Sequence, residues 1–477
     1  MQFPLRSLPT LLVLAGAVPY ALPAQAAQYL VHTPGEYATA TANLQPGDEV
    51  VLANGTWHDV RLLLKGTGTA AAPITLRAQT PGQVVLSGQS DLRLAGAHLH
   101  VANLVFRDGY SPSEAVVAFR ESSKAVARNS RVTGLVIDDY SNPDVAEQDQ
   151  WVMLYGAYNR LDHSQLRGKI NAGPTVVVVR DATQGLDNQH RIDHNWFGPR
   201  PALGVNGGET LRVGTSDTSL SDSNSTVEAN WFEGCDGETE IISNKSGGNT
   251  YRGNVFYRSA GSLTLRHGNG NRVLDNIFLG EGKAGTGGVR VINARQQVSN
   301  NYFQALAGSS NRAGLAVMHG QANAALSGYS PVIDAVIERN TFVDVARLSF
   351  GVGYNAATGM VVPPAGSRFR GNLVVNRNGT DPVTVNGSLA GMAFSGNVQS
   401  PLAATALPGG VDSMTVTLVQ GANGLWAPSP ALAQIGAATN LAVIPRDDTG
   451  VSWYPKQGEW TDAAAVGHRL PANGADR

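Results

Sequence analysis

Two carboxylates and a lysine lie close together in the most polar stretch of the sequence. Glu238 and Glu240 are separated by one residue, and Lys245 follows five residues after Glu240. On a β-strand, residues i and i+2 project from the same face, so the two carboxylates would lie side by side and favour a cation between them. With an amide oxygen such as that of Asn206, they would form the oxygen-rich set that Ca²⁺ prefers. The alternative interpretation is a solvated acidic face without a metal.

A second cation follows Lys245 at nearly one repeat. Arg266 lies 21 residues further on, close to the spacing of 22–25 residues that recurs in this part of the chain. That spacing predicts two neighbouring side chains on adjacent coils of one face. A nearby positive charge favours the neutral amine, the form in which a lysine accepts a proton. The pair therefore indicates proton abstraction from a substrate, with two solvated surface cations as the alternative.

The elements that position these residues are short strands, which end in a recurring Asn-x-Phe pattern that loosens in the last two copies. The successive asparagines are separated by 35, 24, 22, 25, 39, 32 and 25 residues. A base period in the low twenties with occasional insertions is typical of a β-solenoid, in which each repeat forms one coil and insertions form loops. The asparagines are Asn195, Asn230, Asn254, Asn276, Asn301, Asn340, Asn372 and Asn397.

The repeats predict an all-β protein with one elongated domain over residues 27–477. Apolar and polar residues alternate within each repeat, so one face of a strand can form the solenoid core. We expect each asparagine to bond to the backbone at a bend and to stack on the asparagine of the next coil, with the phenylalanines stacked inside. A short helix within residues 35–43 would cap the open end. The repeats weaken beyond about Pro401, which indicates a loop-rich C-terminal cap over about 401–477.

Three motifs, in their order and spacing, resemble those of polysaccharide lyase family 6, which includes alginate lyases and chondroitinase B. They are Asn-Gly-Gly-Glu-Thr-Leu-Arg-Val-Gly (206–214), Glu-Thr-Glu-Ile-Ile-Ser-Asn-Lys-Ser (238–246) and Arg-His-Gly (266–268). The resemblance extends over most of the chain, from Gly-Asp-Glu-Val-Val-Leu (47–52) to Asn372. It implies a right-handed parallel β-helix, in agreement with the repeats.

The resemblance also implies roles for the polar residues. Lys245 would be the Brønsted base and Arg266 the Brønsted acid. Asn206, Glu238 and Glu240 would bind Ca²⁺, which neutralises the carboxylate of the substrate. A guanidinium group hardly loses its proton in proteins, so Arg266 could instead stabilise the leaving oxygen while water supplies the proton.

Further residues match positions at which the family contacts sugar carboxylates. These residues are Arg212, His267 and Arg290, and the planar fork of arginine suits bidentate carboxylate binding. His267 directly follows Arg266 and would point the other way on a regular strand, so its role assumes a bend; a structural histidine is the alternative. Arg200, in a Pro-Arg-Pro segment, is a further candidate loop contact.

The predicted reaction is β-elimination on alginate. Lys245 would remove the C5 proton of a uronate, and loss of the C4 oxygen would leave a C4=C5 double bond. The carboxylate beside C5 must be neutralised, because its negative charge makes the C5 proton only weakly acidic. The segment 241–245 looks more like the alginate branch, and no extra basic cluster suits a sulfated sugar, so alginate is favoured over dermatan sulfate. The single-domain length suggests a preference for alternating mannuronate and guluronate.

Two other classes of protein remain as alternatives. A β-helix glycoside hydrolase would need paired carboxyl groups and no metal. The available candidates are Asp138 with Asp139, which face opposite sides of a strand, and Asp187. A non-catalytic adhesin or scaffold would explain the repeats, but not the placement of Lys245 and Arg266 one coil apart.

Composition limits the partners of the protein. The 477 residues include 35 Lys and Arg and 37 Asp and Glu, for a formal net charge of −2, and 55 glycines. This balance provides no overall field that attracts nucleic acid, so an anionic polysaccharide must be held by a local basic cluster. The low charge also excludes a disordered chain. We expect a monomer.

The N-terminus resembles an export signal over residues 1–26. It combines Arg6, an apolar stretch over 8–18 and Ala24-Gln25-Ala26 as a cleavage site. No later stretch approaches the ~20 apolar residues of a membrane helix, so no membrane partner is expected. The one cysteine, Cys235, can form no internal disulfide and is expected to be a small buried side chain. We therefore expect an exported protein, either periplasmic or secreted.

Overall fold

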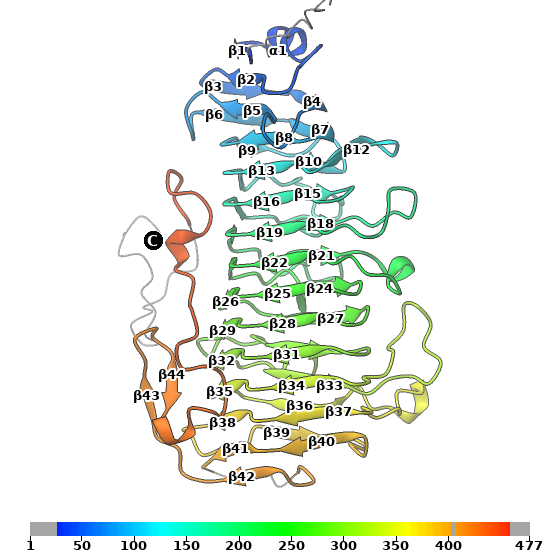
Figure 1. The fold of residues 1–477 in the computed structure, drawn as a ribbon, viewed down its shortest axis with the longest axis vertical. Coiled ribbons are helices and arrows are strands. Elements are labelled where there is room, and N and C mark those ends of the chain that lie inside the picture. Colours follow the sequence, from blue (N-terminus) through cyan, green and yellow to red (C-terminus); the bar gives the residue numbers. More distant parts are fainter. Residues whose placement is uncertain (1–25, 402–405, 458–477) are drawn as a thin grey trace, which may run out of the picture.

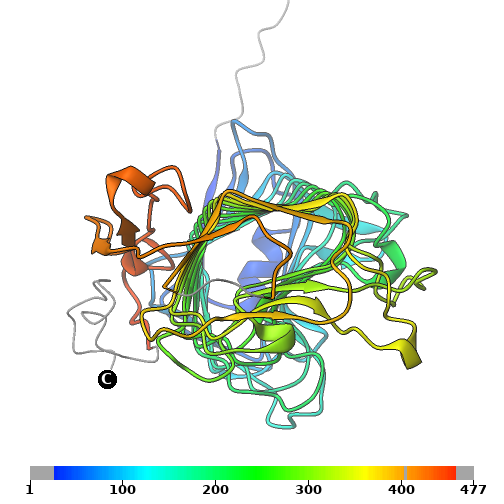
Figure 2. The same ribbon diagram turned by 90° about the horizontal axis from the view of Figure 1, so that it is seen from below.

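The computed structural model, which describes residues 26–401 and 406–457, is a stack of coils in which strands of successive coils lie side by side (Figure 1). The coils form three sheets of 14 strands each, and the strands are parallel apart from the antiparallel pair β11 (Arg120–Ser122) and β12 (Ala125–Arg128). Seen from the end, the coils superpose around a common interior (Figure 2). The fold is a parallel β-helix, so the predicted β-solenoid is confirmed.

The three sheets are called sheets 1, 2 and 3. Sheet 1 contains β1 (Gln28–Val31), β2 (Glu49–Leu52), β5 (Ile74–Ala78), β8 (Leu99–Ala102), β13 (Arg131–Thr133), β16 (Arg160–Asp162), β19 (Arg191–Asp193), β22 (Thr226–Glu228), β25 (Thr250–Arg252), β28 (Arg272–Leu274), β31 (Gln297–Ser299), β34 (Val336–Glu338), β37 (Ser367–Arg370) and β40 (Met392–Ser395). Sheet 2 contains β4 (Arg61–Thr67), β7 (Asp91–Ala97), β10 (Ala115–Ala118), β11 (Arg120–Ser122), β12 (Ala125–Arg128), β15 (Gln150–Leu154), β18 (Val176–Val178), β21 (Leu211–Val213), β24 (Glu240–Lys245), β27 (Ser262–His267), β30 (Val289–Val291), β33 (Leu315–Met318), β36 (Leu348–Val352) and β39 (Val383–Val385). Sheet 3 contains β3 (Gly55–His58), β6 (Val84–Gly88), β9 (Val105–Gly109), β14 (Val136–Asp138), β17 (Gln165–Arg167), β20 (Trp196–Phe197), β23 (Trp231–Glu233), β26 (Val255–Tyr257), β29 (Ile277–Leu279), β32 (Tyr302–Gln304), β35 (Thr341–Val343), β38 (Leu373–Val375), β41 (Asn397–Ser400) and β42 (Val411–Ser413).

Buried asparagines form a ladder along the bend between sheets 1 and 3. From Asn195 to Asn397, the side-chain oxygen of each recurring asparagine accepts bonds from the backbone N–H and Nδ2 of the one before, at 2.9–3.1 Å. Asn276 also donates to the carbonyl of Tyr251. These asparagines are fully buried, and the predicted asparagine stack is confirmed.

The phenylalanines of the repeat stack inside the solenoid, as predicted. Neighbouring ring centroids are 4.5–4.8 Å apart, in the order Phe197, Phe232, Phe256, Phe278, Phe303 and Phe342. Their rings belong to one long core with the buried valines, leucines and isoleucines of all three sheets. Because each coil repeats this core, the outer face of each strand is free to carry polar residues.

A short helix covers the N-terminal end of the core. Helix α1 spans Pro34–Ala40, so it begins one residue before the predicted range of 35–43 and ends three residues before the end of that range. Thr33 caps it, since its hydroxyl accepts a bond from the backbone N–H of Glu36 at 3.2 Å, and Pro34 begins the first turn. Tyr37 packs into the core and closes the end of the solenoid.

The loop-rich C-terminal segment lies along the side of the solenoid. After β42 the chain turns back and runs along the outer face of sheet 3 (Figure 1). It contains the antiparallel pair β43 (Leu418–Gln420) and β44 (Trp426–Pro428) and short 3₁₀ turns at Pro430–Leu432 and Arg446–Asp448. Similar turns lie in earlier loops, at Ser216–Thr218, Ser310–Arg312 and Ala356–Thr358.

Apolar side chains hold this segment in place. Trp196 and Trp231 project from sheet 3 and pack in one cluster with Leu425 and Leu441 of the segment. The segment therefore follows the last coil of the β-helix and also covers an apolar strip on the outer face of sheet 3.

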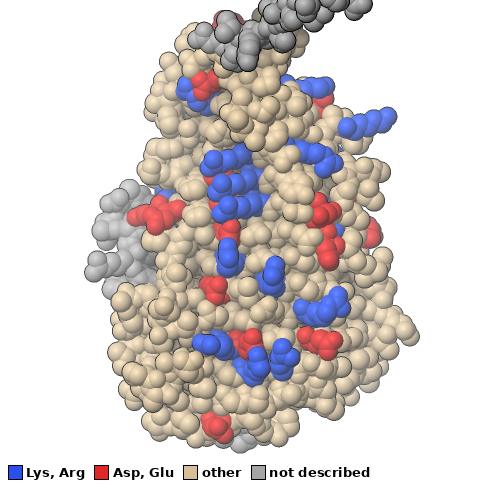
Figure 3. Space-filling view, in the orientation of Figure 1, with Lys and Arg blue, Asp and Glu red and all other residues tan. Residues whose placement is uncertain are grey.

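The outer face of sheet 1 carries a ladder of ion pairs. Figure 3 shows basic side chains in a column over these strands, with acidic ones beside them. The pairs include Arg131 with Asp162 at 2.5 Å, Arg160 with Asp193 at 2.6 Å and Arg191 with Glu228 at 2.8 Å. These charges are paired with one another across adjacent coils.

The predicted export signal lies outside the described residues, apart from Ala26. In the part of the chain that is described, no helix has the length and apolar character needed to cross a bilayer.

Candidate active site

The outer face of sheet 2 carries two of the predicted basic residues, Arg212 and Arg290, in one row. Arg212 on β21 pairs with Ser243 on β24. Thr264 on β27 pairs with Ser243 on one side and with Arg290 on β30 on the other. The residues that precede them on each strand are buried in the core, namely Leu211, Ile242, Leu263 and Val289. Because side chains alternate along a strand, this row points outward.

The register between β24 and β27 shifts before the catalytic candidates. Ser243 pairs with Thr264, but Lys245 pairs with His267, so β27 contains one additional residue over this interval. Lys245 and Arg266 lie on adjacent coils as predicted, but the direct partner of Lys245 is His267. The extra residue also supplies the bend that a role for His267 requires, because it changes the alternation of side chains.

His267 is neutral and fixed between protein groups. Its Nε2 lies 3.1 Å from the Ser216 hydroxyl, and its Nδ1 lies 3.4 Å from Nη1 of Arg266. Burial, together with the positive charges of Arg266 and Lys245, lowers the pKa of His267 to about 3. With Arg266 donating to Nδ1, the ring proton lies on Nε2 and faces Ser216. Lys245, Arg266 and His267 therefore form one cluster.

A loop between β33 and β34 holds the guanidinium of Arg266. Nη1 donates to the carbonyl of Gly328 at 2.7 Å and Nη2 to that of Ser327 at 2.8 Å. The guanidinium carbon lies 4.1 Å from the ring centroid of Tyr329. Burial lowers the pKa of Arg266 from its ordinary value.

Tyr329 also contacts the second arginine of the site. Its hydroxyl lies 3.4 Å from Nη2 of Arg290, and the Arg290 guanidinium lies 5.5 Å from its ring centroid. Nη1 of Arg290 in turn lies 3.4 Å from Oε1 of Glu240. Sequence reasoning missed Tyr329, because it lies in a loop insertion that shares no repeat or charge pattern with the strands. Only its place between the two arginines reveals it.

Two guanidinium groups of the row have unsatisfied donors. The Nε atoms of Arg212 and Arg290 are buried and have no hydrogen-bond partner. A buried donor without a partner costs free energy, which a ligand acceptor would recover. The planar fork of arginine matches a carboxylate, so this face is suited to an anionic ligand.

Three carboxylates lie beside the basic row. Oε2 of Glu238 accepts the backbone N–H of Gly207 at 2.9 Å, and Oε2 of Glu240 accepts the hydroxyl of Ser243 at 2.5 Å. Burial, with repulsion from Glu209 and Glu240, raises the pKa of Glu238 to about 7. The buried Oε2 of Glu209 has no hydrogen-bond partner. Glu209 was not among the predicted residues, although it lies within the 206–214 motif.

The donor atoms of this acidic group are of the kind that bind a divalent cation. Within residues 26–401 and 406–457, no group of three or more His, Cys, Asp and Glu side chains is arranged to hold a metal. The predicted set has a different composition, with two carboxylates and the amide of Asn206, an exposed residue directly before Gly207. Burial and the neighbouring carboxylates disfavour the ionised form of Glu238, and the Oε2 atom of Glu209 has no hydrogen-bond partner, so a cation between these groups would offset both costs. Carboxylate and amide oxygens are ligands that suit Ca²⁺.

Arg200 does not reach this face, and its predicted role in substrate binding is wrong. Arg200 is buried, and its guanidinium donates to the carbonyls of Glu209 at 2.9 Å, Gly173 at 2.9 Å and Asn171 at 3.1 Å. These bonds occupy the donors that a sugar would need. Arg200 instead connects the loop that carries Glu209 to the preceding coil.

The acidic residues of the hydrolase alternative lie apart from the basic row. Asp138 ends a strand of sheet 3 and accepts the Tyr454 hydroxyl at 2.6 Å. Asp139 pairs with Arg167 at 3.0 Å, and Asp187 accepts Asn224 Nδ2 at 2.9 Å. Each has a structural partner. Cys235 is also buried, as expected, and burial raises its pKa to about 12, which keeps the thiol unreactive.

The chain matches the chondroitinase B family over residues 31–440. It is 48% identical to AlyGC, a family 6 alginate lyase, over 90% of this chain, with a TM-score of 0.89. The chain belongs to polysaccharide lyase family 6. It spans only 59% of the length of AlyGC.

Two other solved structures extend the comparison. A mannuronic-acid-specific family 6 lyase from the human gut microbiota is 31% identical, with a TM-score of 0.74, over 82% of this chain and 91% of its own. A family 6 alginate lyase solved with a trisaccharide is 22% identical, with a TM-score of 0.73, over 89% of this chain and 95% of its own. At that identity it supports the fold alone. None of the curated proteins that were compared matches the chain.

Proposed function

We propose that the protein is an alginate lyase that cleaves by β-elimination. The observation that carries the proposal is the cluster of Lys245, Arg266 and His267 beside Arg290 on one face of sheet 2. The identity of 48% to AlyGC supports alginate as the substrate. Family membership alone would also allow dermatan sulfate, which the test below includes.

Lys245 is the proposed base. Its amine takes the C5 proton of a uronate, the C5–H electron pair forms the C4=C5 double bond, and the C4–O bond breaks toward the leaving sugar. Arg266 is held by two loop carbonyls, so it offers a fixed positive charge to the leaving oxygen. Water then supplies the proton to that oxygen, because guanidinium retains its own. Neutral His267 adds no further charge beside Lys245.

Other residues neutralise and orient the sugar carboxylate. The free Nε donors of Arg212 and Arg290 are suited to carboxylate oxygens. Asn206, Glu238 and Glu240 would hold Ca²⁺, which when bound supplies positive charge to the uronate carboxylate. Neutralisation lowers the barrier to removal of the C5 proton.

The expected export, the monomeric state and the preference for alternating blocks are part of the same proposal. N-terminal sequencing of protein recovered from the periplasm or medium tests cleavage before Ala27. Sedimentation tests the monomer, and initial rates on mannuronate, guluronate and alternating blocks test the preference.

The activity is tested with three polymers. The purified chain is incubated with alginate, dermatan sulfate and polygalacturonate, and the ultraviolet absorbance of the unsaturated product is followed with and without EDTA. We expect absorbance with alginate and a loss of rate with EDTA. New reducing ends without this absorbance would indicate hydrolysis, and turnover of dermatan sulfate alone would make the protein a chondroitinase. An unchanged rate in EDTA would show that the reaction does not require Ca²⁺, and the assignment of Lys245 as the base would still stand.

A further inference from the structure

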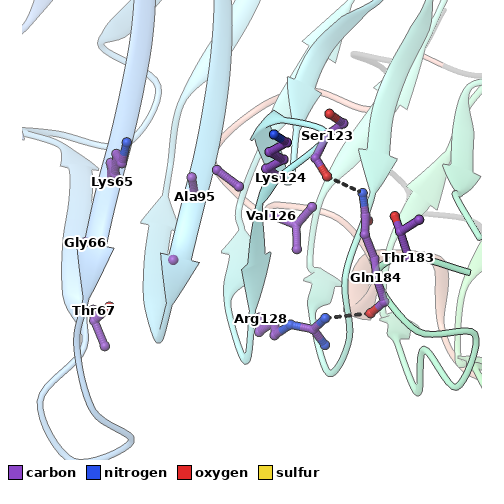
Figure 4. Close-up of a pocket in the computed structure, with 12 residues that line it drawn as sticks. Lys65, Gly66, Thr67, Ala95, Ser123, Lys124, Val126, Arg128, Thr183 and Gln184 are labelled. Atoms are coloured by element: carbon purple, nitrogen blue, oxygen red, sulfur yellow. Dashed lines mark hydrogen bonds between the residues drawn. The ribbon is translucent and has the colours of Figure 1, made fainter. Parts of the chain in front are cut away.

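A second basic hollow lies toward the N-terminal end of sheet 2. Its volume is about 650 Å³, within the range of sites that hold small molecules. It is lined by β4, β7, the β11–β12 hairpin and the loop that carries Thr183 and Gln184 (Figure 4). The proposed mechanism uses none of these residues.

The charged residues that line this hollow are all basic. Lys65, Lys124 and Arg128 line it, and its lining contains no aspartate or glutamate. The chain has only six lysines, and two of them line this hollow, so positive charge is concentrated there. Lys65 pairs with Glu121 at 2.8 Å, while Lys124 has no ion-pair partner among the described residues. At least one cation is therefore available to an anion.

The hollow also offers a hydrogen-bond acceptor. Gln184 is 9% exposed, and its buried Oε1 has no partner, whereas its Nε2 donates to the carbonyl of Ser123 at 3.2 Å. In Figure 4, Lys124 and Arg128 lie between Lys65 and Gln184. A ligand that pairs with the cations and also donates a hydrogen bond to Gln184 must carry both a negative charge and a hydroxyl group. A uronate sugar has both, whereas a fully ionised phosphate has no donor.

The hollow and the candidate active site share one face of sheet 2. The row of residues in register that connects them is Leu63, Arg93, Ala118, Met153, Val177, Arg212 and Ser243. Lys65 lies two residues beyond Leu63, and Lys245 lies two beyond Ser243, so both project outward. The hollow is four to six strand spacings from Lys245, roughly 20–30 Å.

We propose that this hollow is an accessory site for uronate residues of the polysaccharide that is cleaved at Lys245. The inference rests on the proposed function, because it assigns the same polymer to a second place on the enzyme. A polymer long enough to occupy both places gains affinity from the second contact, since that contact is intramolecular once the first has formed. A trisaccharide is too short to gain it.

The test compares polymer and trisaccharide as substrates. Lys65→Gln with Lys124→Gln removes two charges from the hollow, and Arg272→Gln with Arg368→Gln removes two exposed charges from sheet 1 as the matched control. We expect the hollow variant to raise KM for alginate about fivefold, with kcat and the KM for the trisaccharide unchanged. The control should leave all values unchanged. Equal KM for alginate in the two variants would overturn the accessory site.

A binding measurement separates this inference from the proposed function. In the Lys245→Ala background, a fluorescent alginate decasaccharide is titrated with and without the hollow substitutions, at constant ionic strength. Weaker binding only with the hollow substitutions supports the site, even if the wild-type chain shows no lyase activity. If inorganic phosphate or cellohexaose displaces the decasaccharide from the hollow as well as unlabelled alginate does, the assignment to uronate is wrong.

Discussion

At the scale of single residues, Tyr329 links the two arginines of the candidate active site. Its ring lies against the guanidinium of Arg266, and its hydroxyl contacts Arg290. The ring itself packs against an apolar cluster that includes Met318 and Met360. Tyr329 therefore connects the position of both charges to the packing of the loop between β33 and β34.

Replacing Tyr329 tests this connection. Tyr329→Ala should lower kcat/KM on alginate roughly tenfold, because it removes a cation–π contact worth about 1 kcal/mol and loosens Arg266. Tyr329→Phe keeps the ring and should stay within about threefold of wild type, because a long contact of the hydroxyl contributes little. Full activity of the alanine variant would show that the loop does not position Arg266.

Glu238 should couple pH to cation binding. Its pKa is raised to about 7 from the ordinary 4.5, so the metal-free folded state binds more protons than the unfolded state between these values. The contribution of Glu238 to the free energy of unfolding is thus fully present below pH 4.5 and is lost as pH rises through 7. Ca²⁺ requires the ionised form, so it should raise Tm more at about pH 8 than at about pH 5.5.

Thermal unfolding with and without Ca²⁺ at the two pH values measures this coupling. Glu238→Gln has no charge to titrate, so it should lose the pH difference, while the half-buried Glu121→Gln, which lies outside the acidic group, should retain it. A Ca²⁺-induced change in Tm that is the same at both pH values in the wild type would contradict the assignment.

Residue type and spacing were enough to find Lys245 and Arg266, whose separation follows the coil period, so their common face could be predicted. Arg212 and Arg290 were found only through the resemblance to the family. Arg200 was misassigned because a Pro-Arg-Pro segment does not reveal that the coil encloses its side chain. The loop residues that hold Arg266 could not be predicted either, because the length of a loop does not show onto which face of the solenoid the loop folds back.

At the scale of elements, the asparagine ladder connects the coils that carry the site. Asn276 bonds to the asparagine before it and to the one after it, and it is fully buried. The Asn-x-Phe spacing predicted both the ladder and the aromatic stack, because side chains that repeat with the coil must superpose. The register shift in β27 could not be predicted, since one extra residue within a strand leaves the period almost unchanged.

Asn276→Ala should therefore destabilise the fold. It leaves the backbone N–H of Asn254 without its partner in the interior and removes one bond to the carbonyl of Tyr251, at a cost of about 1–3 kcal/mol in the free energy of unfolding. Urea denaturation followed by circular dichroism measures the change. Asn43→Ala, an exposed change near the helix α1, serves as the control. A stability equal to that of the control would show that the ladder contributes nothing.

At the scale of the whole molecule, sheets 1 and 2 differ in how their charges are arranged. On sheet 1 a ladder of arginines pairs with carboxylates of adjacent coils, whereas on sheet 2 basic residues gather at the candidate active site and at the accessory hollow. A net charge of −2 is therefore compatible with an anionic substrate, because the attraction is local. The C-terminal segment lies on the third face and leaves sheet 2 free.

That segment is attached by a buried ion pair. Nε of Arg446 lies 2.6 Å from Oε2 of Glu233, and both side chains are 1% exposed. Arg446→Ala should lower the free energy of unfolding by about 3–5 kcal/mol, because Glu233 would remain charged and buried. Denaturant unfolding measures the loss, with the exposed Arg368→Ala as control. Equal stability of the two variants would show that the segment is not held by this pair.

The most direct test of the account is the activity of Lys245→Ala on alginate. Removal of the base should reduce formation of unsaturated product at least a thousandfold, as expected for the loss of general-base catalysis. The circular dichroism spectrum and Tm should match wild type, since Lys245 projects from the outer face of β24. Arg272→Ala, an exposed cation on sheet 1, should retain full activity. A folded Lys245→Ala variant that forms unsaturated product at near the wild-type rate would contradict the assignment of Lys245 as the base.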